Sequence, residues 1–299
     1  MADSPGPRRT PSDNSRAPLW LMVAAVLAVG GYLGWRQWQQ HQASLVVAPA
    51  TAPVPAVPDT PAAPIAAIPS PPAIQHPIDP PAPDASANPM PGLADADPYV
   101  SERLIGLLGR PDVLAFLQLD GFVRRAVATV DNLARDTAPV SVWPVKPTPG
   151  RFATAPAANG GPEAVAAIAP TNAARYTPFV RFVESVDTAQ AVALYRRLYP
   201  LFQQAHEEQG FPGRYFNDRL VQVLDLLIAT PVPAQPPTVT LVEVKGDVPS
   251  TRPWVRYEFA DPALESLSAG QKMLLRTGAD NHQRLRTKLI DIRQRIARP

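Results

Sequence analysis

The chain has 299 residues, contains no cysteine and carries a formal net charge of +2. Without cysteine it has no disulfide, no thiolate nucleophile and no cysteine-ligated zinc site. A positive charge this small for the length gives no indication of nucleic-acid binding, so no nucleic-acid partner is expected.

The first element that we expect is a membrane helix. Residues 17–35 carry no charge, and as a helix they would rise about 28 Å, close to the roughly 30 Å hydrocarbon core of a bilayer. Aromatic residues occur near both ends of this run, as is typical of the two membrane interfaces; they are Trp20, Tyr32, Trp35 and Trp38. We therefore predict a transmembrane signal-anchor helix over residues 17–38, with the lipid bilayer as its partner.

A cleavable signal peptide is the competing interpretation of this segment. Residues 28–30 (AVG) loosely resemble a small-x-small cleavage site. Cleavage there would cut inside the apolar run, and bulky Trp35 and Trp38 follow closely. These two features favour an anchor that is not cleaved.

The arginines that flank the run predict its orientation. Arg8, Arg9 and Arg16 precede it, whereas after Arg36 the next basic residue is Arg103. Positive charge is retained on the cytoplasmic side. We predict that residues 1–16 form a cytoplasmic tail in a bacterial inner-membrane protein and that everything after the helix is periplasmic.

Residues 39–98 are expected to form a disordered tether rich in proline and alanine. Residues 48–98 contain 16 prolines and five aspartates but no lysine or arginine. A segment with so few large apolar side chains cannot offset the entropy lost on ordering, so it should be extended and partly polyproline II.

Residues 99–299 then show helical periodicity and form the predicted mostly helical domain. Apolar stripes predict helices near residues 101–108, 113–117, 122–133, 187–205, 216–227 and 268–296. Pro200 interrupts the fourth of these, so we expect a kink or two abutting helices there. Residues 136–170 resemble a long surface excursion with a short strand near Phe152.

The strongest strand signals occur late in the chain. Residues 238–244 alternate between apolar and polar side chains, and residues 254–259 follow after a turn at Gly246 and Asp247. Together they predict one β-hairpin. The expected fold class is therefore mainly α with a small β-hairpin (α+β), preceded by one transmembrane helix and a disordered linker.

The domain offers few residues for catalysis and none in a metal-binding pattern. His206 has no second histidine at helical spacing, so no metal and no cofactor is expected. Carboxylates suited to acid–base work on a glycan are present, but the sequence does not place any two together; they are Asp131, Asp218, Asp225, Glu258, Asp261 and Glu265. Structural ion pairs are the simpler interpretation, with Asp131 and Arg135 at helical i,i+4 spacing.

Two groups of residues are candidate binding sites. The first is a polar cluster that would line a cleft; it consists of Asp131, Asn132, Arg175, Tyr176 and Asn217. The second is the basic face of the last helix, represented by Arg293 and Arg295, which would contact anionic lipid, lipopolysaccharide phosphate or an acidic partner. The alternative for the second group is a helix docked on the core with a solvated basic back.

Several longer motifs resemble those of the proteobacterial family called domain of unknown function 3014. The motifs are residues 127–135 (VATVDNLAR), 174–178 (ARYTP), 194–202 (LYRRLYPLF), 257–262 (YEFADP) and 264–276 (LESLSAGQKMLLR). The resemblance implies a single-pass inner-membrane protein that faces the periplasm, and it supplies no activity.

Together these observations predict a binding or scaffolding module of the cell envelope. Its partner would be an envelope protein, a glycan or an anionic lipid. The alternative is an enzyme that acts on peptidoglycan or another envelope polymer through paired carboxylates.

Overall fold

The computed structural model describes residues 73–79, 89–156, 165–243 and 251–297. The chain divides after residue 66, and all the described residues belong to the second part, residues 67–299. The predicted membrane helix, with its interfacial aromatic residues, and most of the predicted tether lie outside the described residues. Within the described ranges, no helix is both long enough and apolar enough to cross a membrane.

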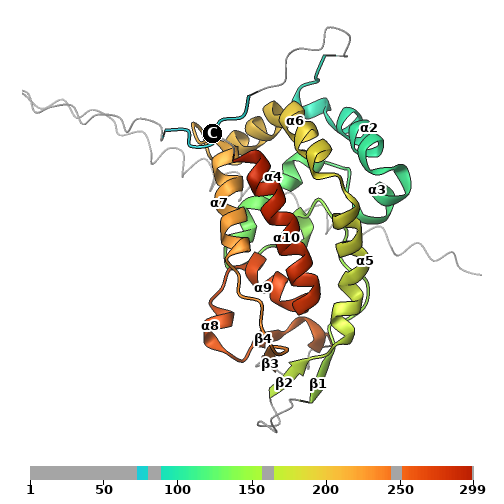
Figure 1. Cartoon of the computed structure of the whole chain (residues 1–299), viewed down its shortest axis with the longest axis vertical. Helices are drawn as coiled ribbons and strands as arrows, with labels where there is room; N and C mark the ends of the chain where they lie inside the picture. Colours follow the sequence, from blue (N-terminus) through green and yellow to red (C-terminus); the bar gives the residue numbers. More distant parts are fainter. Residues whose placement is uncertain (1–72, 80–88, 157–164, 244–250, 298–299) are drawn as a thin grey trace, which may run out of the picture. The chain divides into compact units, whose positions relative to one another are not determined.

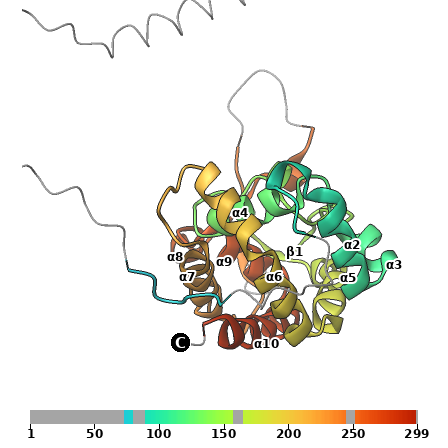
Figure 2. The same cartoon turned by 90° about the horizontal axis from the view of Figure 1, so that it is seen from above.

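Four helices form the body of the domain (Figures 1 and 2). They are α4 (Phe122–Leu133), α6 (Thr188–Glu208), α7 (Phe216–Ile228) and α10 (Ala279–Ile296). Helix α4 contacts α6 and α7, and α10 contacts the same two helices, so the four close into a ring around shared apolar side chains. Helix α5 (Thr171–Ser185) packs along α10, which lies between α7 and α5 in Figure 1.

The remaining helices pack around this body. They are η1 (Leu93–Asp95), α2 (Asp97–Leu108), α3 (Arg110–Phe116), η2 (Val140–Val142), η3 (Pro253–Val255), α8 (Pro262–Glu265) and α9 (Ala269–Arg276). Helix α2 contacts α3, α4 and α6, and α9 contacts α4, α7 and α10.

Side-chain caps begin two of the helices. The Asp187 side chain accepts a hydrogen bond from the Gln190 backbone N–H at 2.9 Å and caps α6. Ser268 and Gln271 form a reciprocal capping box at the start of α9. Pro200 lies inside α6, which is assigned as one helix rather than the two abutting helices considered above.

The sheet is larger than the predicted hairpin. Strands β3 (Thr238–Leu241) and β4 (Tyr257–Phe259) pair antiparallel, which confirms the hairpin. Strands β1 (Thr154–Pro156) and β2 (Val165–Ile168) extend it into a four-stranded antiparallel sheet of order β1-β2-β3-β4. The excursion predicted over residues 136–170 therefore contributes two strands, and the fold is mainly helical with a small antiparallel sheet.

The sheet lies at one end of the helical body (Figure 1) because its apolar face packs there. Ile168, Val239 and Phe259 are buried in one cluster with Leu275 of α9. Trp254 lies in η3 rather than in the strand that was predicted to begin with it.

The folded domain begins earlier than residue 99, where the sequence placed its boundary. Leu93 and Ala96 are buried in the main core, and α2 begins at Asp97. Ile78, within the predicted tether, is also buried in this core. The end of the predicted tether is thus part of the domain, because isolated apolar side chains between its prolines are buried in the main core.

Close packing between α9 and its neighbours generates a prediction about Gly270. A Cβ added there would lie 2.7 Å from Leu227 Cδ2 and 2.9 Å from the Leu133 carbonyl oxygen. Such overpacking is costly, so Gly270→Ala should lower the free energy of unfolding by about 1–3 kcal/mol in urea titrations.

The matched control for that prediction is Gly106→Ala in α2, where an added Cβ meets nothing within 4 Å. This change should instead raise the free energy of unfolding by roughly 0.5–1 kcal/mol, because alanine restricts the unfolded chain more than glycine does. Equal effects of the two substitutions would contradict the packing described for α9.

Candidate functional site

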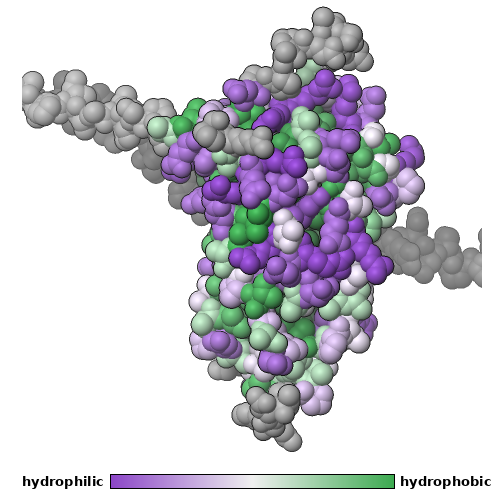
Figure 3. All heavy atoms as spheres, viewed as in Figure 1, coloured by the Kyte–Doolittle hydropathy of each residue, from purple (hydrophilic) through white to green (hydrophobic). Residues whose placement is uncertain are grey.

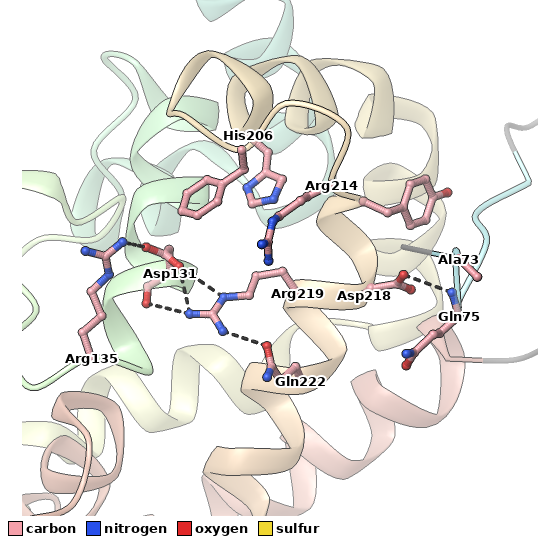
Figure 4. A pocket seen from close by; sticks show the side chains of 11 residues that line it. Ala73, Gln75, Asp131, Arg135, His206, Arg214, Asp218, Arg219 and Gln222 are labelled. Carbon is pink, nitrogen blue, oxygen red and sulfur yellow. Dashed lines mark hydrogen bonds and ion pairs between the residues drawn. The ribbon is translucent and has the colours of Figure 1, made fainter. Parts of the chain in front are cut away.

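A cavity of about 530 Å³ opens between α4, the end of α6, the first turn of α7 and residues 73–79, which we call the strap. We call this cavity the arginine pocket (Figure 4). Its lining residues are Ala73, Gln75, Asp131, Arg135, His206, Phe211, Arg214, Tyr215, Asp218, Arg219 and Gln222.

Asp131 forms the centre of the charge network at one side of the pocket. It follows Val127 by one turn on the inner face of α4, and its side chain is only 10% exposed. Arg135, four residues later and just past the end of α4, forms an ion pair with it, as the sequence predicted. Arg219 of α7 donates to Asp131 Oδ1 from Nη2 at 2.8 Å and from Nε at 3.2 Å. A nearly buried carboxylate is thereby neutralised by two guanidinium groups (Figure 4).

Asp218 points the other way, toward the strap (Figure 4). Its two carboxylate oxygens accept hydrogen bonds from the backbone N–H groups of Gln75 at 3.0 Å and His76 at 2.7 Å. The Ile78 N–H donates to the Tyr215 hydroxyl at 2.7 Å. These bonds are made to the strap backbone, and the side chain of Ile78 adds an apolar anchor in the core.

Asn217 is fully buried, and its side-chain amide forms hydrogen bonds with three separate segments of the chain. Its Nδ2 donates to the carbonyl oxygen of His76 at 2.9 Å and to that of Ile296 at 3.2 Å. Its Oδ1 accepts from the Tyr195 hydroxyl at 3.0 Å. Burial raises the pKa of Tyr195, and Tyr215 nearby raises it further, so this phenol stays protonated and remains a donor.

His206 forms part of the pocket wall. It is 2% exposed and its ring stacks on Phe211 with a centroid distance of 4.6 Å. Burial lowers the pKa of its imidazole; Asp131 opposes this effect, whereas Arg219 and Arg214 add to it. The ring is therefore neutral at pH 7, and its buried Nδ1 has no hydrogen-bond partner among the residues that the structure describes.

Both carboxylates of the pocket are engaged in contacts within the protein. Asp131 is bound by two guanidinium groups, and both oxygens of Asp218 are occupied by backbone N–H groups. Across the part of the chain that the structure describes, no three histidine, aspartate or glutamate side chains converge in a way that could hold a metal ion.

The predicted polar cluster is distributed over different places. Only Asp131 of its members lines the arginine pocket. Asn132 donates back to the Ala128 carbonyl within α4. Arg175 donates to the Pro149 and Gly150 carbonyl oxygens near the sheet and lies 5.5 Å from the ring centroid of Tyr176.

The basic residues of α10 are engaged within the domain. Arg284 pairs with Glu184, Arg286 donates to Ile228 O, Lys288 to Val186 O, Arg293 pairs with Asp225, and Arg295 pairs with Asp291. The apolar stripe of this helix packs into two core clusters. The surface over α10 and α5 is mainly hydrophilic (Figure 3). These contacts fit the docked-helix alternative.

Two of the other predicted carboxylates have local structural roles. Asp261 caps α8, and Glu265 pairs with Lys272 while accepting from the Phe259 N–H. Glu258 is exposed on β4. Of the six candidates, only Asp131 and Asp218 line a common cavity among the described residues, and both are held there by contacts within the protein.

Sequence reasoning missed Arg214, Arg219, His206 and the strap as parts of one site. Their positions in the sequence carry no motif, because the pocket forms only when α4, α6, α7 and residues 73–79 come together. The one local signal was the i,i+4 spacing of Asp131 and Arg135.

The ion-pair network predicts a large effect of neutralising Asp131. Asp131→Asn would leave Arg219 partly buried without its carboxylate, so the free energy of unfolding should fall by about 2–4 kcal/mol. Asp120→Asn is the matched control: Asp120 is 97% exposed in its side chain and pairs with Arg125 only at 3.8 Å. The Asp120→Asn substitution should change the free energy of unfolding by no more than about 0.5 kcal/mol. A loss at Asp131 no larger than at Asp120 would contradict the role assigned to the buried carboxylate.

Comparison with known proteins identifies a family for the chain. No curated protein and no solved structure matches it. The family described as "Protein of unknown function (DUF3014)" matches residues 122–293, which is more than half of the chain and spans α4 to α10, including most of the arginine pocket. The chain therefore belongs to the DUF3014 family.

Proposed function

We propose that this protein is a non-enzymatic binding module of the bacterial cell envelope and that its ligand site is the arginine pocket. Residues 17–38 anchor it in the inner membrane, residues 1–16 remain in the cytoplasm, and the domain described above is periplasmic. The charge-free run with arginines on its N-terminal side supports this topology.

One observation about the pocket carries the binding proposal. Its two carboxylates and two of its three arginines are already satisfied by partners within the protein, whereas the guanidinium of Arg214 has no ion-pair or hydrogen-bond partner among the described residues. Arg214 is an exposed residue, so its guanidinium is open to a ligand that enters the cavity without breaking a contact within the protein.

The enzyme alternative needs a pair of carboxylates that face a common space. Of the carboxylates proposed for that role, Asp131 and Asp225 are held in ion pairs with arginine. Asp218 is held by the strap. These three carboxylates already serve as partners of groups within the protein, which supports the binding proposal over hydrolysis of an envelope polymer.

The proposed topology predicts the behaviour of reporter fusions. Alkaline phosphatase, which is active only outside the cytoplasm, should be active when it is fused after residue 45. It should be inactive when it is fused after residue 16, ahead of the predicted membrane helix. Activity of the second fusion, or inactivity of the first, would refute the proposed orientation.

Site-specific photo-crosslinking in living cells tests the binding role of the pocket. A photoreactive residue at Gln222, an exposed position in the pocket wall, should form a discrete adduct with one envelope component that mass spectrometry can identify. The matched control is Val255 in η3, which is 67% exposed and lies outside the pocket lining.

The outcome of the crosslinking distinguishes the proposal from non-specific contact. An adduct at Gln222 that is absent at Val255 supports a ligand in the pocket. The same set of adducts at both positions, or no adduct at Gln222, would show that the pocket is not the binding site.

A further inference from the structure

The arginine pocket contains more positive than negative charge. Its lining includes Arg135, Arg214 and Arg219 against Asp131 and Asp218. His206 adds no charge at pH 7, because burial lowers the pKa of its imidazole. The pocket therefore holds one positive charge in excess.

That excess charge is located at Arg214. Arg135 and Arg219 share Asp131, and Arg219 also donates to Gln222 at 2.7 Å. Arg214 uses only its backbone, whose carbonyl oxygen accepts from Gln203 Nε2 at 2.9 Å. In Figure 4 its side chain extends toward Arg219 and no interaction links it to the residues drawn.

The strap occupies the second acid of the pocket. Asp218 is the other acid of the pocket, and both of its oxygens are occupied by the N–H groups of Gln75 and His76. Those bonds turn the carboxylate toward the strap (Figure 4). With the strap docked, neither aspartate of the pocket pairs with Arg214.

The size and walls of the pocket indicate an organic ligand. A cavity of about 530 Å³ lies within the range of small-molecule sites and far exceeds the volume of a simple inorganic anion. Phe211 and Tyr215 provide aromatic surface, and the amides of Gln75 and Gln222 provide polar contacts.

We infer that the arginine pocket binds a small organic monoanion whose carboxylate pairs with the guanidinium of Arg214. The planar guanidinium matches a carboxylate through two parallel hydrogen bonds. A single excess positive charge matches one negative charge, whereas a phosphate dianion would bring a second that the pocket does not balance. The inference rests on the proposed function and names the ligand class for the same site.

The strap and the ligand are coupled through Asp218. If the strap leaves, the Asp218 carboxylate loses its two N–H donors and competes with the ligand for Arg214. Docking of the strap therefore favours ligand binding, and by thermodynamic linkage the ligand favours docking of the strap to the same extent.

Calorimetric titration of the purified full chain in neutral detergent tests the ligand class. The probes are benzoate with its uncharged analogue benzamide, D-glucuronate with D-glucose, and inorganic phosphate. At least one carboxylate should bind saturably at a concentration below about 10 mM, with its neutral analogue and phosphate at least about tenfold weaker. Equal binding of the charged and neutral partners, stronger binding of phosphate, or no saturable binding of either carboxylate would overturn the inference.

Substitutions locate the binding charge. Arg214→Gln should weaken carboxylate binding by about tenfold or more, since its side chain has no structural partner to lose. Arg110→Gln is the matched control, because Arg110 is exposed at the start of α3 and outside the pocket lining. Unchanged affinity in the Arg214 variant, or an equal loss in the Arg110 variant, would overturn the assignment of Arg214.

Substitutions of two isoleucines in the strap test whether docking of the strap is coupled to ligand binding. Ile78 is 8% exposed and anchored in the core, whereas Ile74 is 54% exposed. Ile78→Asn should release the strap and weaken carboxylate binding several-fold, whereas Ile74→Asn, which adds no charge beside the pocket, should change binding much less. Equal affinity of the two variants would overturn the coupling.

The photo-crosslinking and the calorimetric titration test different claims, so a negative result in one can be distinguished from a negative result in both. A discrete adduct in the pocket without carboxylate binding would refute the ligand class and leave the binding module in place. Absence of both would refute the proposed function itself.

Discussion

Three consecutive side chains in the first turn of α7 hold this domain together. Successive residues of an α-helix point about 100° apart, so Asn217, Asp218 and Arg219 reach in three directions. Asn217 binds the strap and the end of α10, Asp218 binds the strap alone, and Arg219 binds Asp131 on α4. One helical turn thereby joins segments that are as far apart in the chain as His76 and Ile296.

The same turn also determines what the pocket is able to bind. Arg219 and Arg135 neutralise Asp131, and the strap occupies Asp218, so the charges needed for structure are satisfied internally. Buried polar groups are costly when they lack partners, which explains why this network is so completely connected. Arg214 lies at the edge of the network, and its charge is left for a group from outside the domain.

The predicted tether has a structural role in this arrangement. Its sequence is poor in large apolar residues, yet Ile78, Leu93 and Ala96 enter the core. Backbone N–H groups of the strap bind side chains of α7, a type of contact that depends little on the strap's own side chains. A low-complexity segment can therefore become ordered where a folded surface supplies acceptors and a site for one apolar anchor.

Local patterns in the sequence determined several elements of this protein. The apolar stripes of α4, α6, α7 and α10, the caps at Asp187 and Ser268, the β3–β4 hairpin and the Asp131–Arg135 pair all depend on residues within a few positions of one another. Only the tertiary structure decided the contribution of β1 and β2, the start of the folded domain before residue 99 and the membership of the arginine pocket. These features need pairings such as His76 with Asn217 and Asp131 with Arg219, whose partners lie 141 and 88 residues apart. Periodicity and spacing report on neighbours along the chain, whereas such contacts arise only when packing of the helices brings distant segments together.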